Sequence, residues 1–183
     1  NHAAALQLRR ELLAIRTRAL GDDHPDAASA RTGVAVSLAR LGRIDEADRL
    51  MADAGAVHIA VFGENSVAYS GFMVEQARVH MAAGRLQDAD SVLARSTSIL
   101  RSRGMTTTVP YIERLVLHAT VLTGRGELAA AEALLAEALE RSRASFSGTA
   151  QVQREVHRAY EQLYTKWNRP ADAARHRDHA ARG

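Results

Sequence analysis

The sequence predicts an all-α fold in which a pair of antiparallel helices repeats along the chain. The first observation is composition: the 183 residues include 36 alanines but only 12 glycines and 3 prolines, and 4% are aromatic. This composition favours packed helices over β-sandwiches and barrels. The second observation is a helical pattern that recurs every 42 residues, and the third is a helix-ending residue at the same place in each period.

The repeated turn is the clearest part of the pattern. Gly42, Gly84 and Gly126 are separated by two intervals of 42 residues, and the next step reaches Asn168. Glycine and asparagine tolerate the left-handed backbone conformation that ends many helices. The column therefore predicts one interhelical turn used four times.

Small residues repeat with the same period and predict sites where helix backbones approach closely. One column follows the turn by five residues and comprises Ala5, Ala47, Ala89, Ala131 and Ala173. Two others comprise Ala35, Ala77 and Ala119 before the turn, and Ala54, Ser96, Ala138 and Ala180 after it. Bulkier columns alternate with them, namely Leu38, Leu122 and Tyr164, and then Leu8, Leu50, Val92 and Leu134. Helices with this alternation interlock.

A second break occurs in each period, at residues 21–26, 63–68, 105–110 and 147–152. One column of these breaks consists of residues whose side chains accept hydrogen bonds from helix N-termini: Asp23, Asn65, Thr107 and Thr149. We expect these four residues to cap helices. Pro25 fits the first helical position, where its missing N–H is not needed.

These breaks define about nine helices, which we expect at residues 3–20, 25–41, 44–61, 66–83, 86–103, 108–124, 128–144, 149–167 and 170–181. Residues 1–183 then form a single array without a second domain. The array comprises the second helix of a truncated repeat at 1–20, full repeats at 21–62, 63–104 and 105–146, and a capping repeat at 147–183. Because the chain opens on Asn1 in a helical pattern, we expect it to be a fragment of a longer polypeptide.

The small-residue columns around a glycine turn resemble those of the tetratricopeptide repeat (TPR). The 42-residue period and the segments LGDDHPDAA and LGRIDEA are similar to the longer form of this repeat, which is found in kinesin light chain and in bacterial multidomain proteins. The resemblance implies a right-handed superhelical α-solenoid whose first helices line a concave peptide-binding groove. HEAT-like helix pairs are the alternative, but they do not require the small columns.

No motif of catalysis appears in the sequence. Cysteine is absent, and so are a G-x-S-x-G elbow and the glycine-rich loops that bind phosphates. His176 and His179 share a face of the last helix, but only Asp172 or Asp178 offers a third zinc ligand nearby, so a solvated helix is the better interpretation. We expect neither an enzyme nor a cofactor nor a metal.

Membranes and nucleic acids are not the expected partners. No segment approaches the roughly 18 apolar residues of a membrane span, and the sequence lacks the basic start and apolar run of a signal peptide, so we expect a soluble, cytoplasmic protein. The net charge is +3, with 24 basic and 21 acidic residues. Arginines alternate with acidic residues along the helices, which is typical of a solvated surface rather than of a nucleic-acid interface.

The resemblance places the groove on one stripe of the first helices. Carried through the 42-residue register, the stripe comprises Thr32, Val36, Arg40, Val74, Arg78, Met81, Val116, Thr120, Thr123, Arg158, Gln162 and Lys166. An apolar floor with cations suits a peptide that carries acidic residues. Alternatively, Val74, Met81 and Val116 only pack neighbouring helices. Tyr160, Tyr164 and Trp167 form an aromatic stripe, which is more often part of a core than a ligand platform.

The expected function is therefore a non-catalytic scaffold that binds a protein segment. One alternative is a regulatory or oligomerisation tail of a larger bacterial serine/threonine kinase or transcription regulator. Another is self-association, because a first helix rich in Leu6, Leu12, Leu13 and Ile15 must pack on a missing neighbour or on another copy.

Overall fold

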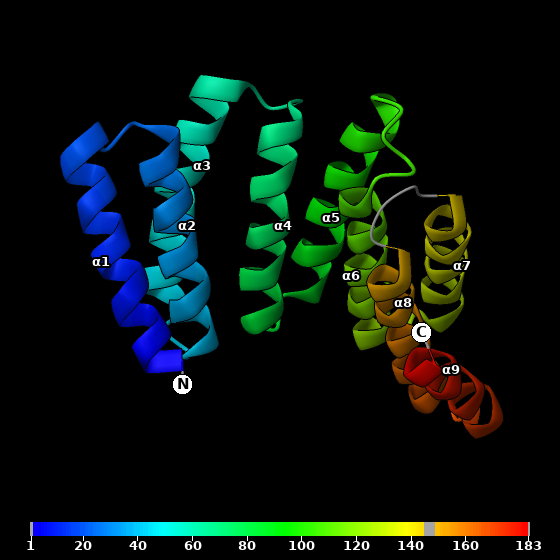
Figure 1. Ribbon diagram of the computed structural model, residues 1–183. Coiled ribbons are helices and arrows are strands. Elements are labelled where there is room, and N and C mark those ends of the chain that lie inside the picture. The colour runs from blue at the N-terminus through cyan, green and yellow to red at the C-terminus, as the bar shows by residue number, and fades with distance from the viewer. Residues whose placement is uncertain (1, 145–148, 183) are drawn as a thin grey trace. The chain divides into compact units, whose positions relative to one another are not determined.

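The computed structural model describes residues 2–144 and 149–182, in which all regular secondary structure is α-helical. The helices are α1 (His2–Leu20), α2 (Pro25–Arg40), α3 (Ile44–Phe62), α4 (Val67–Ala82), α5 (Leu86–Ser102), α6 (Val109–Arg125), α7 (Leu128–Ala144), α8 (Thr149–Lys166) and α9 (Pro170–Arg182) (Figure 1). Every predicted helix is confirmed, with ends within one residue of the expected positions. Among the described residues, no helix has the length and apolar character needed to span a bilayer.

The chain divides into two compact units, which we call unit 1 (Asn1–Val92) and unit 2 (Leu93–Gly183). In unit 1, α2 packs against α1, α3 and α4, and successive helices run in opposite directions (Figure 1). In unit 2, α6 packs against α7 and α8, and α8 packs against α9. Each unit thus contains the paired helices that the repeat predicts.

The four predicted turns are confirmed and share one hydrogen-bond pattern. Gly42, Gly84 and Gly126 have φ angles of 76°, 73° and 85°, and Asn168 has a φ of 56°. The amide that follows each of them donates to a carbonyl five residues earlier, in the pairs Arg43 to Leu38, Arg85 to His80, Glu127 to Leu122 and Arg169 to Tyr164. This pattern is the Schellman motif, in which carbonyl groups of the last helical turn accept hydrogen bonds that they would otherwise lack.

The predicted cap column was wrong by one residue. Because α2 and α4 begin at Pro25 and Val67, the capping residues are His24 and Ser66 rather than Asp23 and Asn65. The ring nitrogen Nδ1 of His24 accepts from the Asp26 amide, and the Ser66 hydroxyl accepts from the Tyr69 amide. Pro25 occupies the first turn as expected.

The same shift holds at the third break, and at the fourth break the predicted cap, Thr149, is also wrong. α6 begins at Val109, so Thr108 is its N-cap instead of Thr107, and the Thr108 side chain makes no capping bond. Thr149 is already helical, as the first residue of α8. Residues 147 and 148 of that break lie outside the described residues, and residues 150–152 belong to α8.

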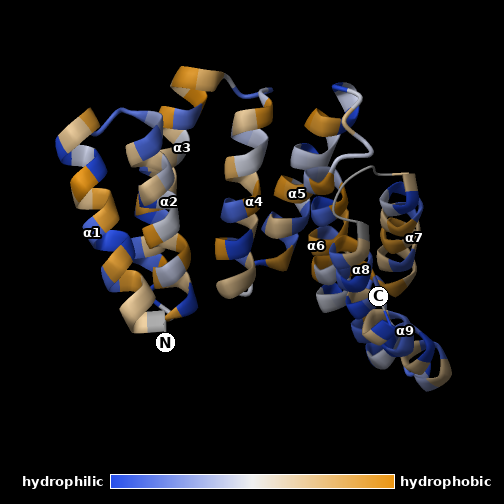
Figure 2. Ribbon diagram, viewed as in Figure 1, coloured by the Kyte–Doolittle hydropathy of each residue, from blue (hydrophilic) through white to orange (hydrophobic). Residues whose placement is uncertain are grey.

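The small-residue columns lie where the helices pack most tightly. Ala47, Ala89 and Ala131 are fully buried, as are Ala54, Ser96 and Ala138. Leu8 differs from its column, because 66% of it is exposed. It lies on α1, which packs mainly on α2, and the outer face of α1 remains open with other apolar residues along it (Figure 2).

An ion pair recurs at equivalent places in the two units. In unit 1 the Arg85 guanidinium lies 2.6 Å from the Asp48 carboxylate, and in unit 2 Arg169 lies 3.5 Å from Glu132. Both pairs join a residue beside the turn to the second helix of the preceding repeat. Hydrogen bonding from Arg85 lowers the pKa of Asp48 below its ordinary value. Because both pairs are half-exposed, water screens them and they add little to the stability of the fold.

The aromatic stripe of α8 belongs to the core of unit 2. Tyr160 and Tyr164 are buried and stacked with their ring centroids 5.7 Å apart, and Trp167 packs against the same core. The Tyr164 hydroxyl donates to the Glu132 carboxylate on α7. The interpretation of these residues as core rather than as a ligand platform is therefore confirmed.

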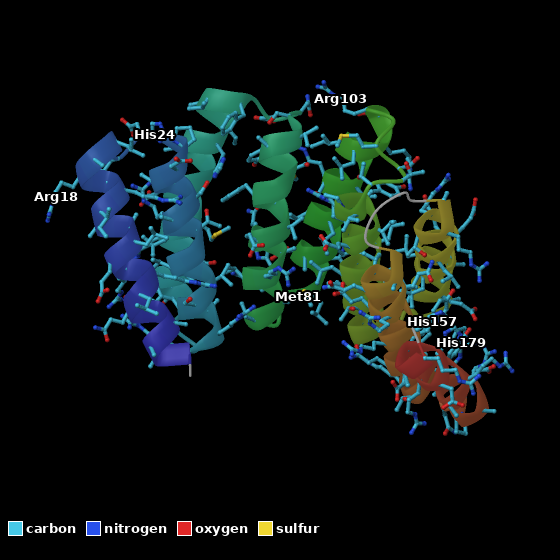
Figure 3. The ribbon with its side chains drawn as sticks, viewed as in Figure 1. Arg18, His24, Met81, Arg103, His157 and His179 are labelled. Atoms are coloured by element: carbon cyan, nitrogen blue, oxygen red, sulfur yellow. The ribbon has the colours of Figure 1, made fainter. Side chains whose placement is uncertain are left out.

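Three histidines meet where α8 packs against α9. Nδ1 of His157 lies 2.9 Å from Nδ1 of His176, and the His157 ring stacks on His179 at 5.0 Å (Figure 3). His176 also stacks on Tyr160 at 4.2 Å. Throughout residues 2–144 and 149–182, however, no group of three or more His, Asp or Glu side chains is placed to hold a metal ion.

Candidate functional site

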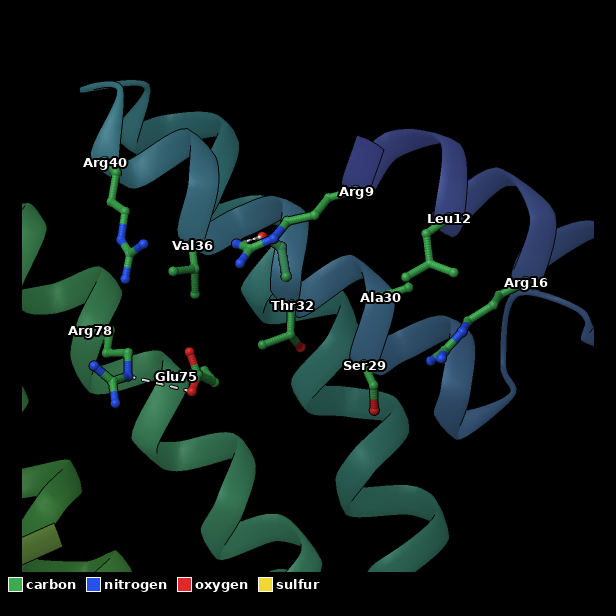
Figure 4. Close-up of a pocket in the computed structure, with 11 residues that line it drawn as sticks. Arg9, Leu12, Arg16, Ser29, Ala30, Thr32, Val36, Arg40, Glu75 and Arg78 are labelled. Carbon is green, nitrogen blue, oxygen red and sulfur yellow. Dashed lines mark hydrogen bonds and ion pairs between the residues drawn. The ribbon is translucent and has the colours of Figure 1, made fainter. Parts of the chain in front are cut away.

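A cavity of about 580 Å³ opens on unit 1 between α1, α2 and α4. It is lined by Arg9, Leu12, Arg16, Ser29, Ala30, Thr32, Gly33, Val36, Arg40, Glu75 and Arg78 (Figure 4). Small residues on α2, among them Ser29, Ala30 and Gly33, leave the space that the cavity occupies. We call this cavity the arginine pocket.

Four guanidinium groups and one carboxylate give the pocket a strong positive charge. Two of the arginines are held by the fold: Arg9 donates to the Gly33 carbonyl at 2.9 Å and to the Ser37 hydroxyl at 2.8 Å. Arg16 donates to the Asp26 carbonyl at 3.1 Å. Because carbonyl and hydroxyl groups are neutral, these bonds leave both positive charges uncompensated.

The other two arginines lie together at one end of the pocket (Figure 4). Arg78 pairs with Glu75 at 3.4 Å, and both side chains are more than 40% exposed. Arg40 is exposed and has no hydrogen-bond or ion-pair partner among the described residues. A long, exposed ion pair is weak in water, so Arg78 and Arg40 are available to an anionic group.

The floor of the pocket is apolar. Val36 is 5% exposed and Leu12 is 42% exposed, so Leu12 presents apolar surface to the cavity. Thr32 is also buried, and its hydroxyl donates to the Ala28 carbonyl of its own helix. The pocket therefore combines an apolar floor with a cationic rim.

Six of the twelve predicted groove residues lie in unit 1. Four of them, Thr32, Val36, Arg40 and Arg78, line the arginine pocket. The other two, Val74 and Met81, are half-buried on α4 and are not among its lining residues.

The remaining six candidates lie in unit 2, and three of them donate hydrogen bonds to backbone carbonyls of the same unit. The hydroxyls of Thr120 and Thr123 donate to the Val116 and Ala119 carbonyls of their own helix. The Lys166 ammonium donates to the Gly124 carbonyl at 2.8 Å, near the end of α6. Arg158 and Gln162 are exposed on α8.

The sequence interpretation missed the contribution of α1. Arg9, Leu12 and Arg16 are spaced by three and four residues and therefore share one helix face. That spacing was visible in the sequence. It was not assigned to the groove because α1 corresponds to a second helix of the repeat, whereas the family resemblance implies that first helices line the groove.

Comparison with known proteins supports the repeat assignment. Residues 1–60 and residues 119–149 each match the tetratricopeptide repeat family. Among proteins with curated descriptions, none matches the chain.

Several solved structures share the fold. A Podosopora anserina structure, described as kinesin light chain with nearly identical TPR-like repeats, is 18% identical with a TM-score of 0.71 and covers 98% of this chain and 85% of its own. A single-substitution variant of that protein is 19% identical with a TM-score of 0.72, covering 98% and 87%. BtubC (BKLC) from P. vanneervenii is 16% identical with a TM-score of 0.75, covering 99% and 72%. The chain therefore carries tetratricopeptide repeats and has the all-α solenoid fold of kinesin-light-chain-like repeat proteins.

Proposed function

We propose that this chain is a non-catalytic interaction module and that the arginine pocket binds an acidic segment of a partner protein. The observation that carries the proposal is the gathering of four guanidinium groups from three helices around an apolar floor. Tetratricopeptide repeats suggest a role in protein–protein interaction, and the pocket supplies chemistry that recognises carboxylates.

The geometry suits a segment with an apolar side chain next to acidic ones. Arginine presents a planar fork of donors that matches a carboxylate. Arg40 and Arg78 can make such bonds after Arg78 releases Glu75, while Leu12 and Val36 contact the apolar side chain. The bound segment then gains both charge complementarity and buried apolar area.

Reversing the charge of Arg40 and Arg78 together is expected to abolish capture of an acidic peptide. The probe is a fluorescent peptide of alternating glutamate and leucine, measured by anisotropy at low salt, beside a lysine–leucine peptide of equal length. We expect the Arg40→Glu/Arg78→Glu variant to bind the acidic probe at least about tenfold more weakly, roughly 1.4 kcal/mol. Thermal stability should be unchanged, because both side chains are exposed.

The control variant, Arg18→Glu/Arg182→Glu, makes the same change in net charge at exposed positions outside the pocket lining. Because charge at a distance is screened, this variant should keep most of the affinity. Equal affinities of the two double variants would show that binding follows net charge and not the pocket, and would remove the proposal.

The open face of α1 supports a second candidate function, self-association. Leu8, Leu12 and Ile15 lie on one helix face and are 66%, 42% and 64% exposed. In the 42-residue register Leu12 corresponds to Ala54, Ser96 and Ala138, which are fully buried. A large apolar side chain at this position therefore extends the apolar surface that a second copy could cover.

Self-association predicts that the mass measured by light scattering rises with protein concentration. Leu8→Lys/Ile15→Lys should abolish this rise, because each lysine would carry its charge into the interface. Lysine at the exposed positions Leu41 and Val61 provides the matched control. If light scattering gives the mass of a monomer even at high protein concentration, self-association is ruled out.

A further inference from the structure

A smaller cavity of about 280 Å³ adjoins the arginine pocket in unit 1. It is lined by Ser29, Thr32, His58, Ala68, Gly71, Phe72 and Glu75. Three of these residues, Ser29, Thr32 and Glu75, also line the arginine pocket, so the two cavities share a wall. We call the smaller cavity the histidine subsite.

His58 is the unusual residue of this subsite. It is only 7% exposed, its Nδ1 atom is buried, and this atom has no hydrogen-bond partner among the described residues. Its ring lies between Phe62 and Phe72, at centroid distances of 5.8 and 5.1 Å. An unpartnered polar atom in such surroundings opposes folding, because it has lost its hydrogen bonds to water.

Packing alone does not require a histidine at this position. In the 42-residue register, His58 corresponds to Leu100 and Ser142, which are both fully buried. Leucine therefore fits the equivalent position in the repeat without an unsatisfied polar atom. A residue that departs from the requirements of packing points to a binding role.

Gly71 gives a second, independent sign that the cavity is kept open. It lies within α4, where glycine lowers helix stability relative to alanine. A Cβ atom built at this position would meet no atom within 4 Å, so the missing side chain is not needed to avoid a clash. The glycine instead leaves empty space in the cavity wall.

The polar groups of the subsite are suited to an uncharged side chain. Burial lowers the pKa of His58, so its imidazole is neutral near pH 7 and has one N–H donor and one acceptor nitrogen. Glu75 contributes a carboxylate that accepts hydrogen bonds and repels an acidic ligand. The neighbouring Arg78 and Arg40 disfavour a cationic ligand. With acidic and cationic ligand groups disfavoured, a carboxamide is the suitable ligand group, because it donates and accepts hydrogen bonds without carrying a charge.

We propose that the histidine subsite binds an asparagine or glutamine side chain of the same partner segment that the arginine pocket holds. The carboxamide NH2 donates to Glu75, its carbonyl accepts from the His58 ring, and its methylene groups contact Phe72. This inference rests on the proposed function, since it adds a specificity-determining contact to that groove.

The test uses a small probe that does not need the arginines. The full chain is labelled with ¹³C in its eight histidines and titrated with N-acetylglutamine amide, with N-acetylnorleucine amide as the apolar comparison. The His58 signal is assigned by its loss in His58→Leu. We expect a saturable shift of this signal at millimolar concentrations of the glutamine probe and no saturable shift with the norleucine probe.

Two substitutions separate binding from stability. Gly71→Leu fills the cavity and should abolish the shift while leaving the melting temperature unchanged or higher, whereas Ala82→Leu, at an exposed position of the same helix, should keep the shift. His58→Leu should raise the melting temperature, because it restores the residue of the equivalent Leu100.

Three results would overturn the subsite: no shift up to tens of millimolar probe, an equal shift with norleucine, or an undiminished shift in Gly71→Leu. None of them bears on the acidic peptide, whose binding is tested through Arg40 and Arg78. Failure of the subsite and failure of the proposed function are therefore distinguishable.

Discussion

Replacing Ala131 with leucine is expected to lower the free energy of unfolding of unit 2 by about 1–3 kcal/mol. Ala131 is fully buried at the start of α7, in one core with Leu122 of α6 and Tyr160 of α8. The added atoms have no space there, so α6 and α7 must separate or the side chain must adopt a strained rotamer. Urea unfolding followed by the fluorescence of Trp167, the single tryptophan, measures the change.

The matched control is Ala130→Leu, one residue earlier on the same helix and exposed. It adds the same atoms with a similar helix propensity, so the urea midpoint should move little. Equal midpoints for the two variants would show that the 42-residue register does not place Ala131 at a close helix contact.

The fold could be predicted because its strongest signals are local and repeated. A residue in the left-handed conformation, such as Gly42 or Asn168, ends a helix through its own backbone geometry. The same turn recurs four times at intervals of 42 residues. Cap positions were less certain, because a break contains several residues able to accept hydrogen bonds. Whether His24 or Asp23 caps α2 depends on one residue of helix phase, which periodicity does not resolve.

The candidate site could be predicted only in part, because it depends on contacts between separate helices. The stripe of first helices included Arg40 and Arg78, which line the arginine pocket. Arg9 comes from a helix of the other type, and its guanidinium reaches Gly33 and Ser37 through tertiary bonds. His58 was invisible as a site residue because its lack of a partner is a property of the packed core and not of the sequence.

Acidification is expected to weaken the packing of α9 on α8. The contact between Nδ1 of His157 and Nδ1 of His176 requires one ring to accept, and a fully protonated pair cannot make it. Burial, followed by the charges of His157 and His179, lowers the pKa of His176 from 6.5 to about 4. Burial lowers the pKa of His157 as well. The charged groups facing this pair from α7 and α9 are Arg143, Asp172, Arg175 and His179.

The sign of this pH effect on the free energy of unfolding follows from proton linkage. Between pH 6.5 and about pH 4 the unfolded chain binds a proton at His176 that the folded chain does not, so the free energy of unfolding falls as the pH falls. Below about pH 4 both states carry the proton and this contribution levels off. Since His176 is only half-buried, solvent screening reduces the effect to the order of 1 kcal/mol.

Urea midpoints of unit 2, followed by Trp167 fluorescence in the presence of EDTA, should therefore decrease between pH 6.5 and pH 4. His176→Phe keeps a ring stacked on Tyr160 but cannot bind a proton, so most of the decrease should disappear. His24→Asn is the matched control, because it removes a histidine from unit 1 while retaining a residue that caps α2. If the urea midpoints of His176→Phe and His24→Asn show the same pH dependence as those of the natural chain, protonation of other groups causes the decrease. The charge of the histidines on α8 and α9 then does not affect how these helices pack.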